Sequence, residues 1–76
     1  MEDIFTTQLK VDQESISFHV VFDEEKYRFI PEKNINSIRE FYVKRDHDQW
    51  MAEGPVNADI KNQAIDNLEE YLLKQL

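Results

Sequence analysis

The chain contains no cysteine, only one glycine and only two prolines. Without cysteine it has no disulfide bond, no thiolate nucleophile and no cysteine-ligated zinc site. A single glycine cannot build a glycine-rich phosphate-binding loop, and neither a Gly-x-Ser-x-Gly nor a His-Glu-x-x-His pattern occurs. We therefore expect a non-enzymatic protein with no catalytic residue and no cofactor.

Positive charge is also scarce, since nine lysines and arginines face sixteen aspartates and glutamates and leave a net charge of −7. Nucleic-acid binding depends on cationic side chains that neutralise phosphates, so we expect no nucleic-acid partner, and anionic membranes are disfavoured in the same way. No apolar stretch approaches the roughly 20 residues that span a bilayer, and the acidic amino terminus is unlike a secretory signal. We expect a soluble, cytoplasmic protein.

The 76 residues suffice for a single domain, residues 1–76. Up to about residue 55, apolar and polar residues alternate as they do in half-buried strands. This pattern predicts strands at about 4–11, 16–22, 27–31, 38–45 and 50–53. After Gly54-Pro55 the apolar residues recur every three or four positions, which predicts a helix at about 58–75 with Asn57 as its N-cap.

Two-residue turns at Gln13-Glu14, Glu24-Glu25 and His47-Asp48 would join these strands into hairpins. The first turn would set Val11 opposite Ile16, and all three turns bring the large apolar residues to one face of the sheet. The segment 31–37 then crosses to the fourth strand and has room for a helical turn. The expected fold is α+β: a five-stranded antiparallel β-meander with one carboxy-terminal amphipathic helix packed on one face.

Three features invite a chemical interpretation. Asp46-His47-Asp48 contains metal-ligand residue types, but adjacent strand residues point to opposite sides, and Asp and His also suit a tight turn. We favour the turn and expect no metal site. As a general base His19 would need an orienting carboxylate and a pocket, and we disfavour catalysis there. Trp50 could anchor a ligand, although a Trp buried beneath the helix is the favoured interpretation.

The sheet face away from the predicted helix is more apolar than a solvated face needs to be. By alternation it carries Ile4 and a possible interaction face formed by Val21, Ile30, Tyr42 and Met51. Half-apolar open sheets often bind a protein, commonly a second copy of themselves. Scattered surface hydrophobic residues are an equally good explanation.

The second half of the chain carries Phe41-x-Val43, then Trp50-x-x-x-Gly54, then Ile65-x-x-Leu68-x-x-Tyr71. These motifs resemble small uncharacterised bacterial proteins in which a β-meander leads into a closing carboxy-terminal helix. The resemblance covers roughly the last half of the chain. It implies the fold and no activity.

The sequence thus favours a small acidic protein-interaction module that acts through its open sheet face or an edge strand, with self-association as one outcome. A first alternative is an acidic inhibitor or immunity-type protein that binds a basic partner, which carboxylates clustered on one surface would favour. A second alternative is a small enzyme subunit, which a pocket containing His19 or His47 would favour.

Overall fold

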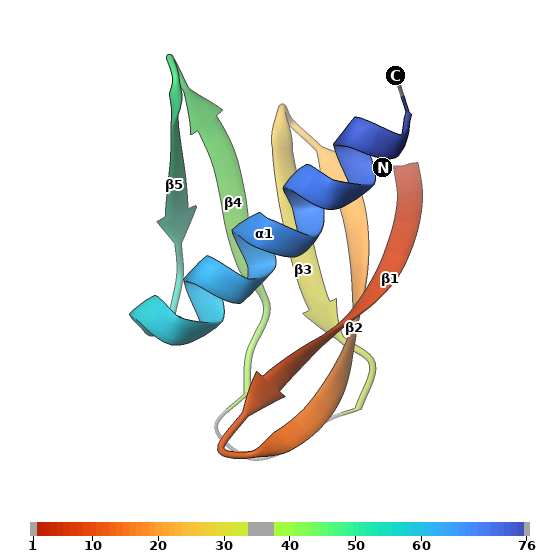
Figure 1. Cartoon of the computed structure of the whole chain (residues 1–76), viewed down its shortest axis with the longest axis vertical. Coiled ribbons are helices and arrows are strands. Elements are labelled where there is room, and N and C mark those ends of the chain that lie inside the picture. The colour runs from red at the N-terminus through yellow and green to blue at the C-terminus, as the bar shows by residue number, and fades with distance from the viewer. Residues whose placement is uncertain (1, 34–37, 76) are drawn as a thin grey trace.

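The computed structural model describes residues 2–33 and 38–75. In these residues the chain forms β1 (Glu2–Val11), β2 (Glu14–Asp23), β3 (Lys26–Pro31), β4 (Phe41–Asp46), β5 (Gln49–Glu53) and α1 (Ala58–Lys74). The strands form one antiparallel sheet in the order β1-β2-β3-β4-β5, and α1 crosses one of its faces (Figure 1). The α+β fold expected from the sequence is confirmed. The helical turn considered within 31–37 falls largely on residues 34–37, which lie outside the described residues.

The core lies between α1 and the sheet. Three phenylalanines form its centre: the rings of Phe29 and Phe41 stack at 5.0 Å between centroids, and Phe18 meets Phe41 edge-on at 5.9 Å. Such ring pairs stabilise a core beyond the area they bury. The other buried side chains of this cluster are Leu9, Ile16, Val20, Val43, Ala64 and Leu68. The alternating and helical periods of the sequence therefore identified the core-facing positions.

The helix begins and ends where the sequence predicts. The Asn57 side-chain oxygen accepts a hydrogen bond from the Ile60 backbone N–H at 2.9 Å, which satisfies one of the unpaired donors of the first turn. Asp59 in the first turn and Lys74 in the last turn match the helix dipole. Leu73, which falls off the apolar stripe, is 68% exposed. By its spacing in the sequence Leu76 continues the apolar stripe, but it lies outside the described residues.

Two of the three hairpin registers agree with the prediction and one does not. Phe22 pairs with Tyr27 across the second turn, and Val43 pairs with Ala52 across the third. In the first hairpin Leu9, rather than Val11, lies opposite Ile16, so the predicted register is wrong by two residues. The turn residues are Asp12 and Gln13, with left-handed φ angles of 51° and 70°. A shift of two residues keeps every side chain on its face, so alternation could not detect the error.

A β-bulge corrects a second expectation. The register of β1 against β2 shifts between Asp3 and Phe5, which leaves Ile4 as the extra residue. Ile4 packs against the core instead of lying on the opposite face with Val21. A bulge interrupts the two-residue period locally, which is why the alternation misplaced this side chain.

Gly54 ends β5 and lets the chain reverse into the helix. Its φ is +114°, and a Cβ atom at this position would lie 3.2 Å from the Phe41 Cβ and 3.3 Å from the Phe41 Cα. Both the backbone angle and the close approach favour glycine here. The stretch from Trp50 to Pro55 is therefore part of the architecture, as the sequence indicated.

Candidate interaction surfaces

The Asp46-His47-Asp48 stretch forms the tip of the β4–β5 hairpin. His47 has a left-handed φ of 60° and a side chain that is 91% exposed. Its Nε2 lies 3.9 Å from an Asp46 carboxylate oxygen. Across the described ranges, 2–33 and 38–75, no three histidine, aspartate or glutamate side chains are placed to hold a metal ion together. The geometry is that of a turn.

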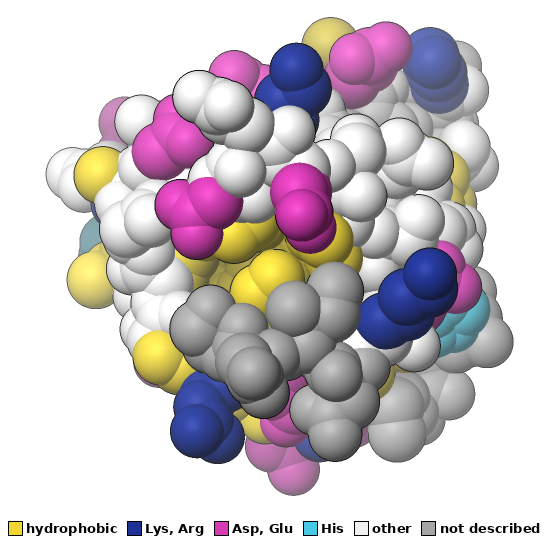
Figure 2. All heavy atoms as spheres, turned by 90° about the horizontal axis from the view of Figure 1, so that it is seen from below, with side chains coloured by type: hydrophobic (Ala, Val, Ile, Leu, Met, Phe, Trp, Pro, Cys, Tyr) yellow, Lys and Arg dark blue, Asp and Glu magenta, His cyan; other side chains and the backbone are white. Residues whose placement is uncertain are grey.

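Three hollows of the described surface lie away from both histidines. A hollow of about 30 Å³ lies at the lower end of the molecule, between Phe18, Ile38, Phe41, Val56 and Ile60. Figure 2 shows this end, where apolar side chains gather beside several carboxylates. Wider hollows adjoin Glu32 and Lys33. His19 and His47 line none of these three hollows.

The open face is the side of the sheet away from α1, and it carries the four residues predicted to form an interaction face. Val21 is only 1% exposed, Ile30 and Tyr42 are half-buried, and Met51 is 43% exposed. Charged residues separate them, because Arg28 pairs with both Val21 and Tyr42 across neighbouring strands. Met51 is therefore the side chain of this set that is most available to a partner. The expectation that Val21 faces solvent is wrong.

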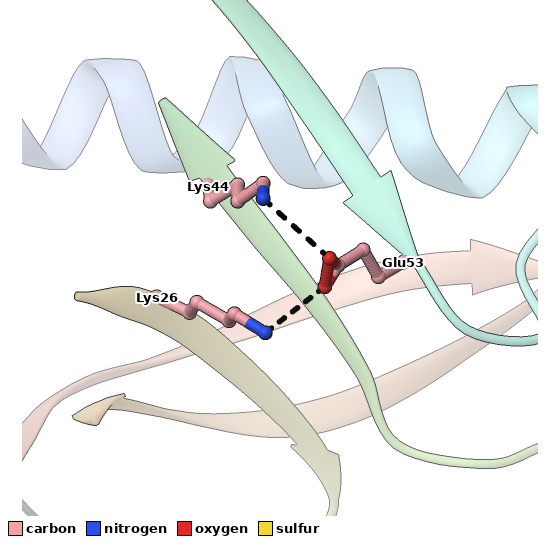
Figure 3. A network of polar contacts seen from close by, with 3 residues as sticks. All are labelled: Lys26, Lys44 and Glu53. Carbon is pink, nitrogen blue, oxygen red and sulfur yellow. Dashed lines mark hydrogen bonds and ion pairs between the residues drawn. The ribbon is translucent and has the colours of Figure 1, made fainter. Parts of the chain in front are cut away.

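Glu53 joins three strands on the open face (Figure 3). Its carboxylate lies 3.1 Å from the Lys26 Nζ on β3 and 3.7 Å from the Lys44 Nζ on β4. The hydrogen bond and the charge of Lys26 lower the pKa of Glu53 below its ordinary value of 4.5, and Lys44 acts in the same direction. The same hydrogen bond and ion pair with Glu53 raise the pKa of Lys26 above 10.5. Both groups are held in their charged forms at neutral pH.

Arg28 is neutralised in the same way. Its guanidinium lies 2.9 Å from Glu40 and 4.0 Å from Asp23, and it stacks over the Tyr42 ring at 5.7 Å. The hydrogen bond to Glu40 raises the pKa of Arg28 above its already high ordinary value. Lys26, Arg28 and Lys44 of the open face are thus each matched by a carboxylate within the chain. This face is a self-paired polar layer and offers little unpaired charge to a ligand.

The two edges of the sheet differ sharply. The edge at β1 is covered by polar side chains of α1: the Lys10 backbone N–H donates to the Gln63 Oε1 at 2.8 Å, and the Gln63 amide donates to the Lys10 carbonyl at 2.9 Å. The Asn67 amide donates to the Thr7 hydroxyl at 2.9 Å and to the Gln8 carbonyl at 3.3 Å. The contacts to Lys10 and Gln8 satisfy backbone groups that an edge strand otherwise leaves open to a partner.

The other edge, which we call the β5 edge, is formed by the backbone of Gln49–Glu53 on the side away from β4. Asp46 and Gln49 close the two-residue turn, so the pairs Asp46–Gln49, Lys44–Met51 and Tyr42–Glu53 exchange the ladder hydrogen bonds. Trp50 and Ala52 then direct their N–H and C=O groups outward. Counted in the same way from the β1–β2 turn, the N–H and C=O groups of Gln8 and Lys10 also point outward. Asn67 binds Gln8 and Gln63 binds Lys10.

Within the part of the chain that the structure describes, no hydrogen bond reaches the outward groups of Trp50 and Ala52. The side chain of Trp50 is half-buried rather than fully buried, because β5 lies at the margin of the sheet. Its indole N–H donates to Glu69 of α1 at 3.1 Å, and the Arg45 guanidinium stacks on its ring at 5.0 Å. Trp50 thus fixes β5 to the helix and leaves the backbone of the strand open.

Sequence reasoning missed the residues that distinguish the two edges. Gln63 and Asn67 are ordinary polar positions of an amphipathic helix, and no local pattern shows that they reach residues more than fifty positions away. No protein-family model matches the chain, and neither a curated protein nor a solved structure matches it. The resemblance of the Trp50-x-x-x-Gly54 region thus rests on its own motifs. In the described residues no helix has both the length and the apolar character needed to cross a bilayer.

Proposed function

We propose that this protein is a non-enzymatic interaction module that binds a protein partner by strand addition at the β5 edge. The observation that carries the proposal is the contrast between the edges: α1 binds the outward groups of Lys10 and the Gln8 carbonyl on β1, whereas those of Trp50 and Ala52 are uncovered in the described residues. A partner strand gains main-chain hydrogen bonds at such an edge, and alternate side chains supply specificity. The absence of cysteine fits a cytoplasmic site of action.

The β5 edge is favoured over the open face for two reasons. Lys26, Arg28 and Lys44 of the open face are already paired within the chain, and of the apolar side chains between them Val21 is buried while Ile30 and Tyr42 are half-buried. β5 also contains no proline and no lysine, two residue types that often protect edge strands from pairing. Its five residues offer a short ladder, which suits a reversible interaction.

The test replaces Ala52 with proline. Proline removes an N–H, and at this position the N–H points outward, so the ladder with β4 keeps all its hydrogen bonds. Wild type, Ala52→Pro and the control Leu73→Ser, which changes an exposed residue on α1, are used to capture proteins from extracts of the native cell. We expect Ala52→Pro to lose the specific partner and Leu73→Ser to retain it. Equal capture by a folded Ala52→Pro variant contradicts the proposal.

A second candidate function, inhibition of a basic partner, is favoured by the charge at one end of the sheet. The β2–β3 and β4–β5 turns lie at the same end of the meander, and Glu24, Glu25, Asp46 and Asp48 are all exposed there. Such a field attracts a cationic protein. The test replaces the two glutamates with glutamine and the two aspartates with asparagine. If the protein inhibits a basic partner, the variant should no longer capture that partner; if it binds by strand addition at β5, capture should be unchanged.

A further inference from the structure

We infer that the strand added at the β5 edge is β5 of a second copy of this chain, paired antiparallel about Met51 so that one sheet runs through both copies. The inference rests on the proposed function and names its partner. It follows from the outward backbone groups, from the side chains of β5 and from the position of the charges beside them.

One register allows β5 to pair with β5 of a second copy through all of its outward backbone groups. With Met51 opposite Met51 of the second copy, Trp50 lies opposite Ala52 of that copy, and Ala52 lies opposite Trp50. Each of these two pairs joins residues whose N–H and C=O groups point outward, so about four hydrogen bonds form and no outward group of either strand is left over.

The neighbouring registers use fewer of these groups. A shift of two residues in one direction sets Trp50 opposite Trp50 and moves Ala52 beyond the strand, opposite Asp48. A shift in the other direction sets Trp50 opposite Gly54, where the backbone has already turned away at a φ of +114°. Only the register centred on Met51 satisfies both outward residues of both strands.

The side chains agree with that register. The large indole of Trp50 comes to lie beside the small side chain of Ala52, and Gln49 lies opposite Glu53, so no two like charges face each other directly. Met51, 43% exposed in the single chain, meets its own counterpart on the open face. A methionine pair adapts readily to such a contact.

The electrostatics of β5 also favour a second copy. Glu53 is the only charged residue of the strand, and its carboxylate is already bound by Lys26 and Lys44. Figure 1 shows α1 in the layer over one sheet face, with its first turn on the β5 side, whereas an added strand pairs in the plane of the sheet. The strongly acidic turns lie beyond the ends of the five-residue ladder.

The first test uses a single introduced thiol, which is unique because the chain has no cysteine. Directly opposed residues of a non-hydrogen-bonded antiparallel pair have Cα atoms about 4.5 Å apart, within the range a disulfide requires. We expect Met51→Cys to form a covalent dimer under mild oxidation about tenfold faster than Leu73→Cys, a control on α1 whose side chain is more exposed than that of Met51, because pairing raises the local thiol concentration. Equal rates for the two variants overturn the inference.

The second test exchanges charge at the same position. Met51→Glu and Met51→Lys each set like charges opposite one another in the paired strands, so each variant alone should be monomeric in sedimentation equilibrium. An equimolar mixture should dimerise, because the glutamate of one copy then faces the lysine of the other. A mixture that stays monomeric, or wild type that is monomeric at high concentration, overturns the second copy as partner.

Failure of the inference and failure of the proposed function give different results. If wild type does not self-associate but a different protein is captured in an Ala52-dependent way, the β5 edge binds another partner and only the inference fails. If Ala52→Pro still dimerises and still captures the same proteins, the β5 edge is not the binding surface and both fail.

Discussion

At the scale of single residues, the sequence placed Val21 on the correct face of the sheet but did not predict that its side chain is buried. Alternation places Val21 on the side of the sheet away from α1, yet it is 1% exposed. Its pairing partner on β3 is Arg28, whose guanidinium pairs with Glu40 and Asp23. The aliphatic stem of an arginine covers apolar surface while its head group remains in water. A side chain opposite the helix can therefore be buried by charged neighbours.

This burial predicts the effect of shortening Val21. Val21→Ala should lower the free energy of unfolding by about 1–3 kcal/mol, because it removes two buried methyl groups and leaves a cavity. Leu73→Ala, at an exposed position, should change it by no more than about 0.5 kcal/mol. Urea denaturation followed by Trp50 fluorescence measures both. Equal midpoints for the two variants would show that Val21 is solvated.

The ion pairs of Glu53 should make the stability of the fold depend on pH. Its folded pKa lies below 4.5, so the ion pairs with Lys26 and Lys44 contribute fully above 4.5 and are lost as the pH falls through the lower folded value. Wild type should be more stable than Glu53→Gln at about pH 6, and the difference should shrink once the pH falls below the ordinary glutamate value. Urea midpoints at several pH values measure the difference. A gap that stays constant across this range contradicts the ion-pair network.

At the scale of elements, the covered edge of β1 depends on one glutamine. Gln63→Ala removes both hydrogen bonds to the Lys10 backbone and should cost about 1–2 kcal/mol. The neighbouring Asn62→Ala changes an exposed helix position and serves as the control. The Lys10 amide should exchange its hydrogen faster in Gln63→Ala than in Asn62→Ala. Unchanged exchange at Lys10 would mean that α1 does not cover this edge.

The elements also show what periodicity can and cannot predict. The two-residue period located the core-facing residues Phe18, Phe29 and Val43, because burial of one sheet face imposes that period. It did not fix the first register, since Asp12-Gln13 and Gln13-Glu14 turns give the same faces. Neither turn carries the Asn-Gly pair that would have marked its position. The bulge at Ile4 was invisible for a similar reason: one inserted residue leaves no compositional signal.

At the scale of the whole molecule, the meander and its helix were predictable, but the candidate site was not. The order of five strands and one helix follows from the hydrophobic period, which changes near Gly54 from two residues to three or four. Which edge remains open depends on the path of α1 across the sheet, which brings Gln63 and Asn67 to β1 and only Glu69 to Trp50. That path is a property of the packed layers and has no local sequence signature.

Net charge predicts how self-association responds to salt. Two copies that each carry −7 repel one another, so added salt should screen the repulsion and strengthen the dimer. Binding of a basic partner to the acidic turns should weaken under the same change. Sedimentation equilibrium of wild type in low and high sodium chloride separates these cases. A dimer that dissociates on addition of salt would contradict pairing through the backbone of β5.

The most direct measurement for the whole molecule is residue-resolved amide hydrogen exchange at two protein concentrations. In dilute solution the Trp50 and Ala52 amides should exchange rapidly, while the Lys10 amide, bound by Gln63, should be protected. At high concentration Trp50 and Ala52 should become protected together, and Lys10 should not change. Protection of Trp50 and Ala52 in dilute solution would show that the β5 edge is not open, and rapid exchange at high concentration would show that no second copy pairs with it.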